Sequence, residues 1–141
     1  MAEAEPTPTL EDFPHRTFDK LRYGDTDRQG HVNNAVFATF LETGRVEMLF
    51  AREQGVPGDD MEFVLASVSL SYLAEVTYPG EVWIGTRINR IGNSSIGLVQ
   101  GLFQNGTLVG TAETTVVQVS NQTHRSAPFT EPALAYLRTL Q

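Results

Sequence analysis

The sequence predicts an α+β domain in which one long helix packs on one face of an antiparallel sheet. Two patterns support this prediction. Residues 36–51 have apolar side chains at spacings of three and four, which is typical of a helix. Much of the chain after residue 61 has a period of two, interrupted by turn residues, which is typical of strands. We expect four consecutive strands there, arranged as an antiparallel meander, and one further strand before the helix.

Length and composition fit a single domain and exclude several classes of protein. A chain of 141 residues can bury about two-thirds of the surface that it exposes when unfolded, and no internal repeat is visible. The absence of cysteine excludes disulfides, thiolate nucleophiles and cysteine zinc sites. The three histidines lie far apart, so we expect no metal site. The net charge of −7 repels phosphate backbones, which argues against a nucleic-acid partner.

The N-terminal region predicts a tail and a cytoplasmic location. Residues 1–12 carry four acidic side chains, two prolines and few apolar residues, so we expect a disordered, mobile tail before one domain over residues 13–141. The N-terminus lacks the features of a signal peptide. No apolar run reaches the roughly 20 residues of a membrane span, so we expect no membrane partner.

The first strand is expected between Phe13 and Tyr23, where polar and apolar residues alternate imperfectly. The helix over residues 36–51 follows, and a Gly-x-Pro sequence starting at Gly55 supplies its stop. Gly44 inside this helix would cost up to about 1 kcal/mol relative to alanine. Close approach of a strand or a ligand would explain a glycine there.

The second half of the chain predicts the remaining strands. Residues 64–73 have one apolar face and one face with three serines, as expected for a strand with one face on a core. Pro-Gly, Gly-Asn and Asn-Gly pairs separate further strands, and the last of these pairs is a strong hairpin signal. These strands are expected over residues 82–88, 95–104 and 107–119. A short helix over residues 130–140, capped by Thr130, would end the chain.

The densest group of polar residues lies between the first expected strand and the helix. Residues 22–34 read RYGDTDRQGHVNN and contain two aspartates, two glycines, a histidine and two asparagines. Gly30 permits a backbone conformation that most residues resist. Asn33 or Asn34 can cap the helix. We expect the chemistry of the protein to take place here.

Several interpretations of this stretch stay open at the level of the sequence. DTDRQG resembles the opening of a calcium-binding EF-hand loop, but Gln29 and Val36 occupy the fifth and twelfth positions, where ligands are needed. Hydrogen bonding to amides of the turn is the main reading for Asp25 and a possible one for Asp27. His31 could assist catalysis, orient a water molecule or hydrogen-bond across the loop.

The polar stretch and the order of the elements together resemble the hotdog-fold acyl-CoA thioesterases of the 4-hydroxybenzoyl-CoA thioesterase type. The resemblance covers residues 13–129 and rests on RYGDTDRQGHVNN, AVFATFLETGR, VSLSYLAEVTYPGEVWIGTRI and IGNSSIGLVQGLF. It implies an antiparallel sheet of about five strands around one long central helix. It also implies a homodimer joined edge to edge, further paired into a homotetramer, with acyl-CoA bound at the subunit interface.

The resemblance also implies a catalytic site. The second aspartate of its Asp-X-Asp pair, here Asp27, would act as general base or nucleophile on the thioester carbonyl. The backbone N–H of Asn34 would hold the carbonyl oxygen, as free amides at the start of a helix can do. One branch of the family has a histidine at the position of Asn34, so the role of His31 is open. The substrate-binding candidates are Gly30, Val32, Asn33, Phe37, Arg90, Ser94 and Ser95.

The turn at residues 92–94 departs from the branch of the family that holds the CoA phosphates with basic residues there. Arg90, Ser94, Ser95 and Arg125 are the remaining candidates for that contact. The predicted function is hydrolysis of an acyl-CoA to a free acid and CoA, without a cofactor other than the CoA of the substrate. Two alternatives share the fold: a non-catalytic acyl-CoA or acyl-carrier binding protein, and an enoyl-CoA hydratase.

Overall fold

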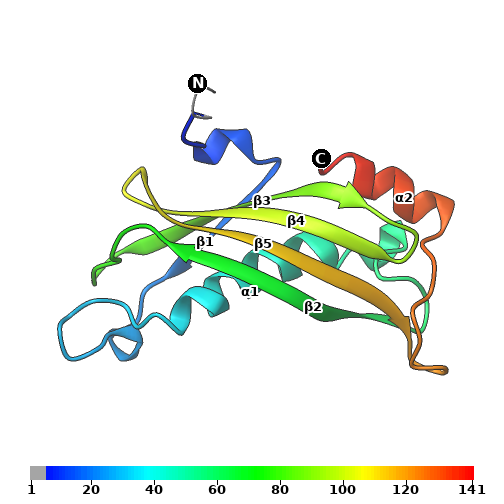
Figure 1. Ribbon diagram of the computed structural model, residues 1–141, viewed down its shortest axis with the longest axis horizontal. Coiled ribbons are helices and arrows are strands. Elements are labelled where there is room, and N and C mark those ends of the chain that lie inside the picture. Colours follow the sequence, from blue (N-terminus) through cyan, green and yellow to red (C-terminus); the bar gives the residue numbers. More distant parts are fainter. Residues whose placement is uncertain (1–5) are drawn as a thin grey trace, which may run out of the picture.

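The computed structural model describes residues 6–141 as a five-stranded antiparallel sheet packed on one long helix (Figure 1). The helix is α1 (Val36–Leu49), and the strands are β1 (His15–Lys20), β2 (Met61–Tyr72), β3 (Glu81–Ile91), β4 (Ser95–Gln104) and β5 (Thr107–Ser120). A second helix, α2 (Glu131–Arg138), follows the last strand, and 3-10 turns occur at η1 (Leu10–Asp12), η2 (Tyr23–Asp25) and η3 (Arg52–Gln54). The predicted α+β class is confirmed, and each predicted helix and strand is present with small shifts of its ends.

Part of the tail predicted over residues 1–12 lies outside the described residues. Within the described part, η1 leads into Phe13, whose ring lies directly over Gly85 in β3. No helix within residues 6–141 combines the length and the apolar character needed to cross a membrane.

The order of the strands corrects the predicted meander. Strands β3, β4 and β5 are consecutive antiparallel neighbours. However, β2 pairs with β5, and β3 pairs with β1 instead of β2. The order is therefore β1-β3-β4-β5-β2. Residues 73–80 between β2 and β3 cross the end of the sheet (Figure 1). The Pro79-Gly80 turn signal is local, and it does not reveal that the linker around it carries the chain to the far side of the sheet. The prediction of a four-stranded meander is therefore wrong for β2.

Strand β2 is an edge strand, and several of its apolar side chains are exposed within one chain. Its register against β5 shifts between Leu65 and Ser67. Because of this bulge, Leu65 and Val68 lie on the face toward α1, whereas Val64 lies on the opposite face. The prediction that one apolar face runs through residues 64–73 is therefore wrong, because the bulge divides it. The exposed large apolar residues of β2 are Val64, Leu65, Val68 and Tyr72, with exposed fractions of 41% to 52%.

The core lies between α1 and the sheet. One apolar cluster surrounds Phe37 in the first turn of the helix, and a second surrounds Met48 near its end and includes Leu137 of α2. Gly44 lies between them and faces β3, where a Cβ atom would come within 2.5 Å of the Ile84 side chain. The close strand approach expected at this glycine is confirmed. Helix α2 is capped as expected, since the Thr130 hydroxyl accepts from the Ala133 N–H at 3.3 Å.

Candidate active site

Residues 22–34 form a closed loop at the end of the sheet where α1 begins (Figure 1). Thr26 and Val32 pair across the loop as an antiparallel bridge. Inside this bridge the N–H of Asp27 donates to the carbonyl of His31 at 2.8 Å. Gly30 adopts a φ of 81°, the left-handed conformation that glycine takes at low cost. The loop therefore has one defined shape, set by its own backbone bonds.

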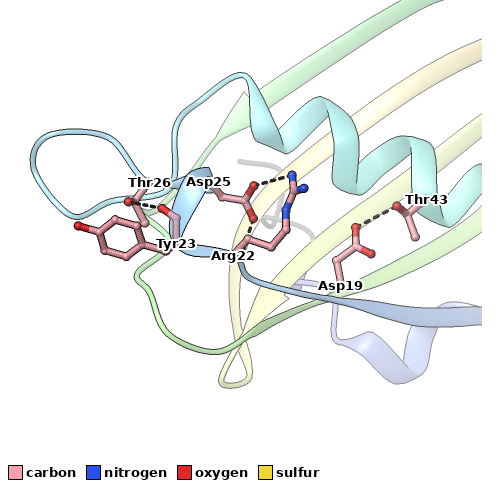
Figure 2. Close-up of polar contacts among 6 residues, drawn as sticks. All are labelled: Asp19, Arg22, Tyr23, Asp25, Thr26 and Thr43. Carbon is pink, nitrogen blue, oxygen red and sulfur yellow. Dashed lines mark hydrogen bonds and ion pairs between the residues drawn. The ribbon is translucent and has the colours of Figure 1, made fainter.

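Asp25 is part of the architecture of this loop. It is buried, with an exposed fraction of 5%. Its two carboxylate oxygens accept from the N–H of Arg22 at 2.8 Å and from the guanidinium of the same residue at 3.0 Å (Figure 2). Its carbonyl accepts from the N–H of Asn33 at 2.8 Å. The interpretation of Asp25 as a residue that hydrogen-bonds the turn is confirmed.

Asp27 has a different environment from Asp25. Its side chain is exposed, and Oδ1 accepts from the N–H of Gln29 at 2.8 Å and from the N–H of His31 at 3.2 Å. Within residues 6–141, Oδ2 makes no hydrogen bond. The loop thus orients the carboxylate through one oxygen and leaves the other available to a ligand. The described residues contain no group of three or more His, Asp or Glu side chains placed to hold a metal ion.

A hollow of about 320 Å³ lies in front of the loop. Its walls come from three elements: the polar loop, the first turn of α1, and the end of β2 with the linker after it. The lining residues are Asp27, Gln29, His31, Val32, Asn34, Phe37, Tyr72, Leu73, Ala74 and Glu75. The three predicted catalytic residues and two of the predicted binding residues are thus brought together. Gly30 and Asn33 belong to the same loop but do not line the hollow.

Asn34, which lines this hollow just before α1, has a free backbone donor within residues 6–141. The Asn33 side chain accepts from the N–H of Ala35 at 3.0 Å, and its carbonyl accepts from the N–H of Val36 at 2.9 Å. The Asn34 carbonyl accepts from the N–H of Phe37 at 3.2 Å. In the described part of the chain, the N–H of Asn34 itself has no acceptor. This N–H lies at the positive end of a helix, where it can stabilise a negative charge.

His31 and Glu75 form a pair that the sequence did not predict. His31 Nε2 of the loop lies 2.8 Å from Glu75 Oε2 of the linker after β2, and both residues line the hollow. Tyr72, also missed as a site residue, donates its hydroxyl to the Asn34 carbonyl at 3.3 Å. No local pattern marks these two residues. Their roles depend on the linker after β2, which runs beside the loop.

The residues predicted to contact the CoA phosphates lie elsewhere in the single chain. Arg90 lies near the end of β3, Ser94 in the turn that follows and Ser95 at the start of β4. This is the opposite end of the sheet from the polar loop (Figure 1). There the Arg90 guanidinium donates to the Ser95 hydroxyl at 3.2 Å. One chain alone therefore does not bring these residues to the hollow.

Comparisons with known proteins agree with this architecture. The PA5185 protein of Pseudomonas aeruginosa strain PAO1 is 28% identical over 96% of this chain and 97% of its own, with a TM-score of 0.84. A thioesterase from Thermus thermophilus, solved with coenzyme A and zinc, is 30% identical over 92% of this chain and 96% of its own, with a TM-score of 0.77. A predicted thioesterase from Bacillus stearothermophilus is 27% identical over 89% and 95%, with a TM-score of 0.79.

These similarities confirm the predicted hotdog fold, a five-stranded antiparallel sheet with a long helix. No curated protein is significantly similar to the chain in sequence. The family model of the thioesterase-like superfamily matches residues 21–137, a span that includes the polar loop, α1 and all strands except β1. The chain therefore belongs to the thioesterase-like superfamily.

Proposed function

We propose that this protein is an acyl-CoA thioesterase, which hydrolyses the thioester of an acyl-CoA to a free acid and CoA. The superfamily supports a thioester hydrolase, and the thioesterase from Thermus thermophilus, which was solved with coenzyme A, supports CoA as the carrier. The observation that carries the proposal is a pairing within one hollow. Asp27, which has one free carboxylate oxygen, and Asn34, which has a free backbone N–H, both line it.

Each of these groups has a defined part in the reaction. The N–H of Asn34 donates to the thioester carbonyl oxygen and stabilises the negative charge that develops there, and one such donor lowers a barrier by roughly 3 to 4 kcal/mol. Asp27 takes a proton from the water that attacks the carbonyl carbon, or attacks that carbon itself and forms an anhydride that water then opens. In both routes the C–S bond breaks, and the CoA thiolate leaves and takes up a proton.

The remaining lining residues define where the acyl group binds. Val32 and Phe37 are buried, at 3% and 1% exposure, and form the inner apolar wall of the hollow. The ring of Tyr72 packs on Phe37 with 5.0 Å between centroids. The acyl group enters against this wall while its carbonyl stays beside Asn34. Gly30 and Asn33 act on the substrate only by shaping the loop.

A homodimer would complete the site. Strand β2 is an edge strand with exposed apolar side chains, and such edges pair readily with a second strand. Two-fold symmetric pairing of β2 with β2 of a second copy is antiparallel. It places the far end of the partner's sheet, which carries Arg90, Ser94 and Ser95, near the hollow of the first copy. In this arrangement the partner supplies the contacts to the CoA phosphates, and two such dimers form the tetramer.

The test is a panel of aliphatic and aromatic acyl-CoAs, with release of free CoA as the measurement. Hydrolysis of at least one member, at a rate well above the uncatalysed reaction, is expected. Tight binding of acyl-CoA without turnover of any member would instead indicate a non-catalytic binding protein. Formation of a 3-hydroxyacyl product from enoyl-CoA would indicate a hydratase.

A further inference from the structure

We propose that Glu75 is a positioning residue for the thioesterase reaction, which it serves by fixing the orientation and the tautomer of the His31 imidazole. This inference rests on the proposed function, because it assigns a role within the same site. The carrying observation is the contact between His31 Nε2 and Glu75 Oε2, which are 2.8 Å apart. Both side chains line the hollow that also contains Asp27 and Asn34.

The backbone sets this contact. The N–H of Val32 donates to the carbonyl of Val76 at 2.8 Å, and His31 and Thr77 form an antiparallel bridge. The linker is tied to the sheet just before Glu75, since the N–H of Leu73 donates to the carbonyl of Val109 at 2.9 Å. The backbone pairing of the loop with the linker therefore brings Glu75 next to His31, although the Glu75 side chain is largely exposed.

A carboxylate accepts hydrogen bonds and donates none, so Glu75 selects the form of His31 that carries a proton on Nε2. In a neutral imidazole the other nitrogen, Nδ1, then has a free lone pair. That lone pair can accept a hydrogen bond from the water that attacks the thioester. A second carboxylate thus acts on the reaction through His31, without touching the substrate.

His31 also joins Glu75 to Asp27. The backbone N–H of His31 donates to Asp27 Oδ1, and the carbonyl of His31 accepts from the N–H of Asp27. The backbone of His31 therefore orients the proposed base, while its side chain is oriented by Glu75. Substitution of Glu75 leaves the two backbone bonds intact, so its effect is confined to the imidazole.

The direct test is the tautomer of His31, read from long-range proton–nitrogen correlation spectra of nitrogen-15-labelled protein above neutral pH. A His31→Gln variant identifies the His31 signals among those of the three histidines. The wild type is expected to show the proton on Nε2. Glu75→Gln is expected to show a mixture of both tautomers, because an amide can donate or accept. A proton on Nδ1 in the wild type, or an unchanged spectrum in Glu75→Gln, would overturn the proposal.

The kinetic test uses the best substrate of the acyl-CoA panel. Glu75→Gln is expected to lower kcat about tenfold with little change in KM, which is less than the roughly 10²- to 10⁴-fold effect of removing an acid–base group outright. In a His31→Gln background the same substitution is expected to have no further effect, and an independent loss there would contradict the proposal. The matched control is Glu11→Gln, an exposed residue of η1 that does not line the hollow.

The two proposals fail in different ways. If the wild type hydrolyses no acyl-CoA, the proposed function is wrong, but the spectra of wild type and Glu75→Gln still decide whether Glu75 holds His31. If the wild type is active and Glu75→Gln leaves both spectrum and kcat unchanged, the thioesterase proposal stands and the role of Glu75 is rejected.

Discussion

The hydroxyl of Tyr72 donates to the carbonyl of Asn34 at 3.3 Å and thereby joins the last residue of β2 to the start of α1. The edge strand proposed to pair with a second copy thus also supports the residue whose N–H is proposed to hold the thioester carbonyl. Replacing Tyr72 by Phe keeps the ring on Phe37 and removes only this bond. We expect a loss of about 0.5–1 kcal/mol in unfolding free energy and a decrease of a few fold in kcat. Urea unfolding and steady-state hydrolysis measure the two effects.

Asp27→Asn is expected to lower kcat by roughly 10²- to 10⁴-fold. The amide oxygen can still accept from the N–H groups of Gln29 and His31, so the loop should keep its shape and the unfolding midpoint should barely change. Asp25→Asn is the matched comparison: it removes the charge of a buried carboxylate that accepts from the exposed Arg22, and it should destabilise the protein by about 1 kcal/mol. Full activity of the Asp27→Asn variant would exclude the Asp27 carboxylate as general base or nucleophile.

Gly44→Ala is expected to destabilise the protein, although alanine favours a helix by up to about 1 kcal/mol. The added Cβ would meet Ile84, Gln100 and Thr86 at 2.5–2.9 Å. Overpacking of this kind typically costs about 1–3 kcal/mol, so a net loss should be visible in urea unfolding. Thr39→Ala, on the exposed side of the same helix, is the control and should change little. A more stable Gly44→Ala variant would show that the sheet moves away at low cost.

His15 should make the protein sensitive to mild acid. Burial of its side chain in β1 lowers the pKa of the imidazole, and the nearby Glu47 carboxylate opposes that effect only in part. The unfolded chain then binds a proton more readily than the folded one, so stability is expected to fall as the pH drops below the usual histidine pKa of 6.5.

A His15→Gln variant checks this pH dependence. Its unfolding free energy should decline less than that of the wild type when both are measured by urea unfolding on either side of that pKa. Glu47→Gln removes the opposing charge and should steepen the decline. Equal slopes for the wild type and His15→Gln would assign the acid sensitivity to other groups.

Charging the apolar edge should separate the subunits. In Leu65→Glu combined with Val68→Glu, two carboxylates occupy the face of β2 toward α1, where the proposed dimer would bury them without partners. Sedimentation should show a dimer or larger species for the wild type and a monomer for the variant, with acyl-CoA hydrolysis lost in the monomer. Thr107→Glu, exposed at the start of β5, is the control. A monomeric wild type with full activity would refute the dimer.

The sequence was sufficient for the helices and strands because their signals are local. The periodicity around Gly44 marks α1, and Asn105-Gly106 fixes the β4–β5 hairpin within a few residues. The place of β2 was not predictable in this way. The alternation of apolar and polar residues in β2 predicts a strand. Whether that strand pairs with β3 or with β5 depends on the path of the linker after Tyr72.

The same division holds at the site. The stretch around Asp27 was found from its own composition, and the separation of Asp25 as a structural residue followed from turn chemistry. Glu75 and Tyr72 carry no such signal, since a glutamate in a linker and a tyrosine at a strand end are ordinary features. They meet the loop only because two segments about forty residues apart in sequence pair through the backbone at Val32 and Val76.

The free donor at the start of α1 belongs to the main chain, and this affects how the site responds to genetic change. Nineteen of the twenty genetically encoded residues would present the same N–H at position 34, so an alanine scan would pass over it. Only proline, or an ester bond introduced by chemical synthesis, removes the hydrogen atom itself. Under the proposed mechanism, mutational surveys of this protein will therefore find Asp27 readily and will not detect the Asn34 N–H.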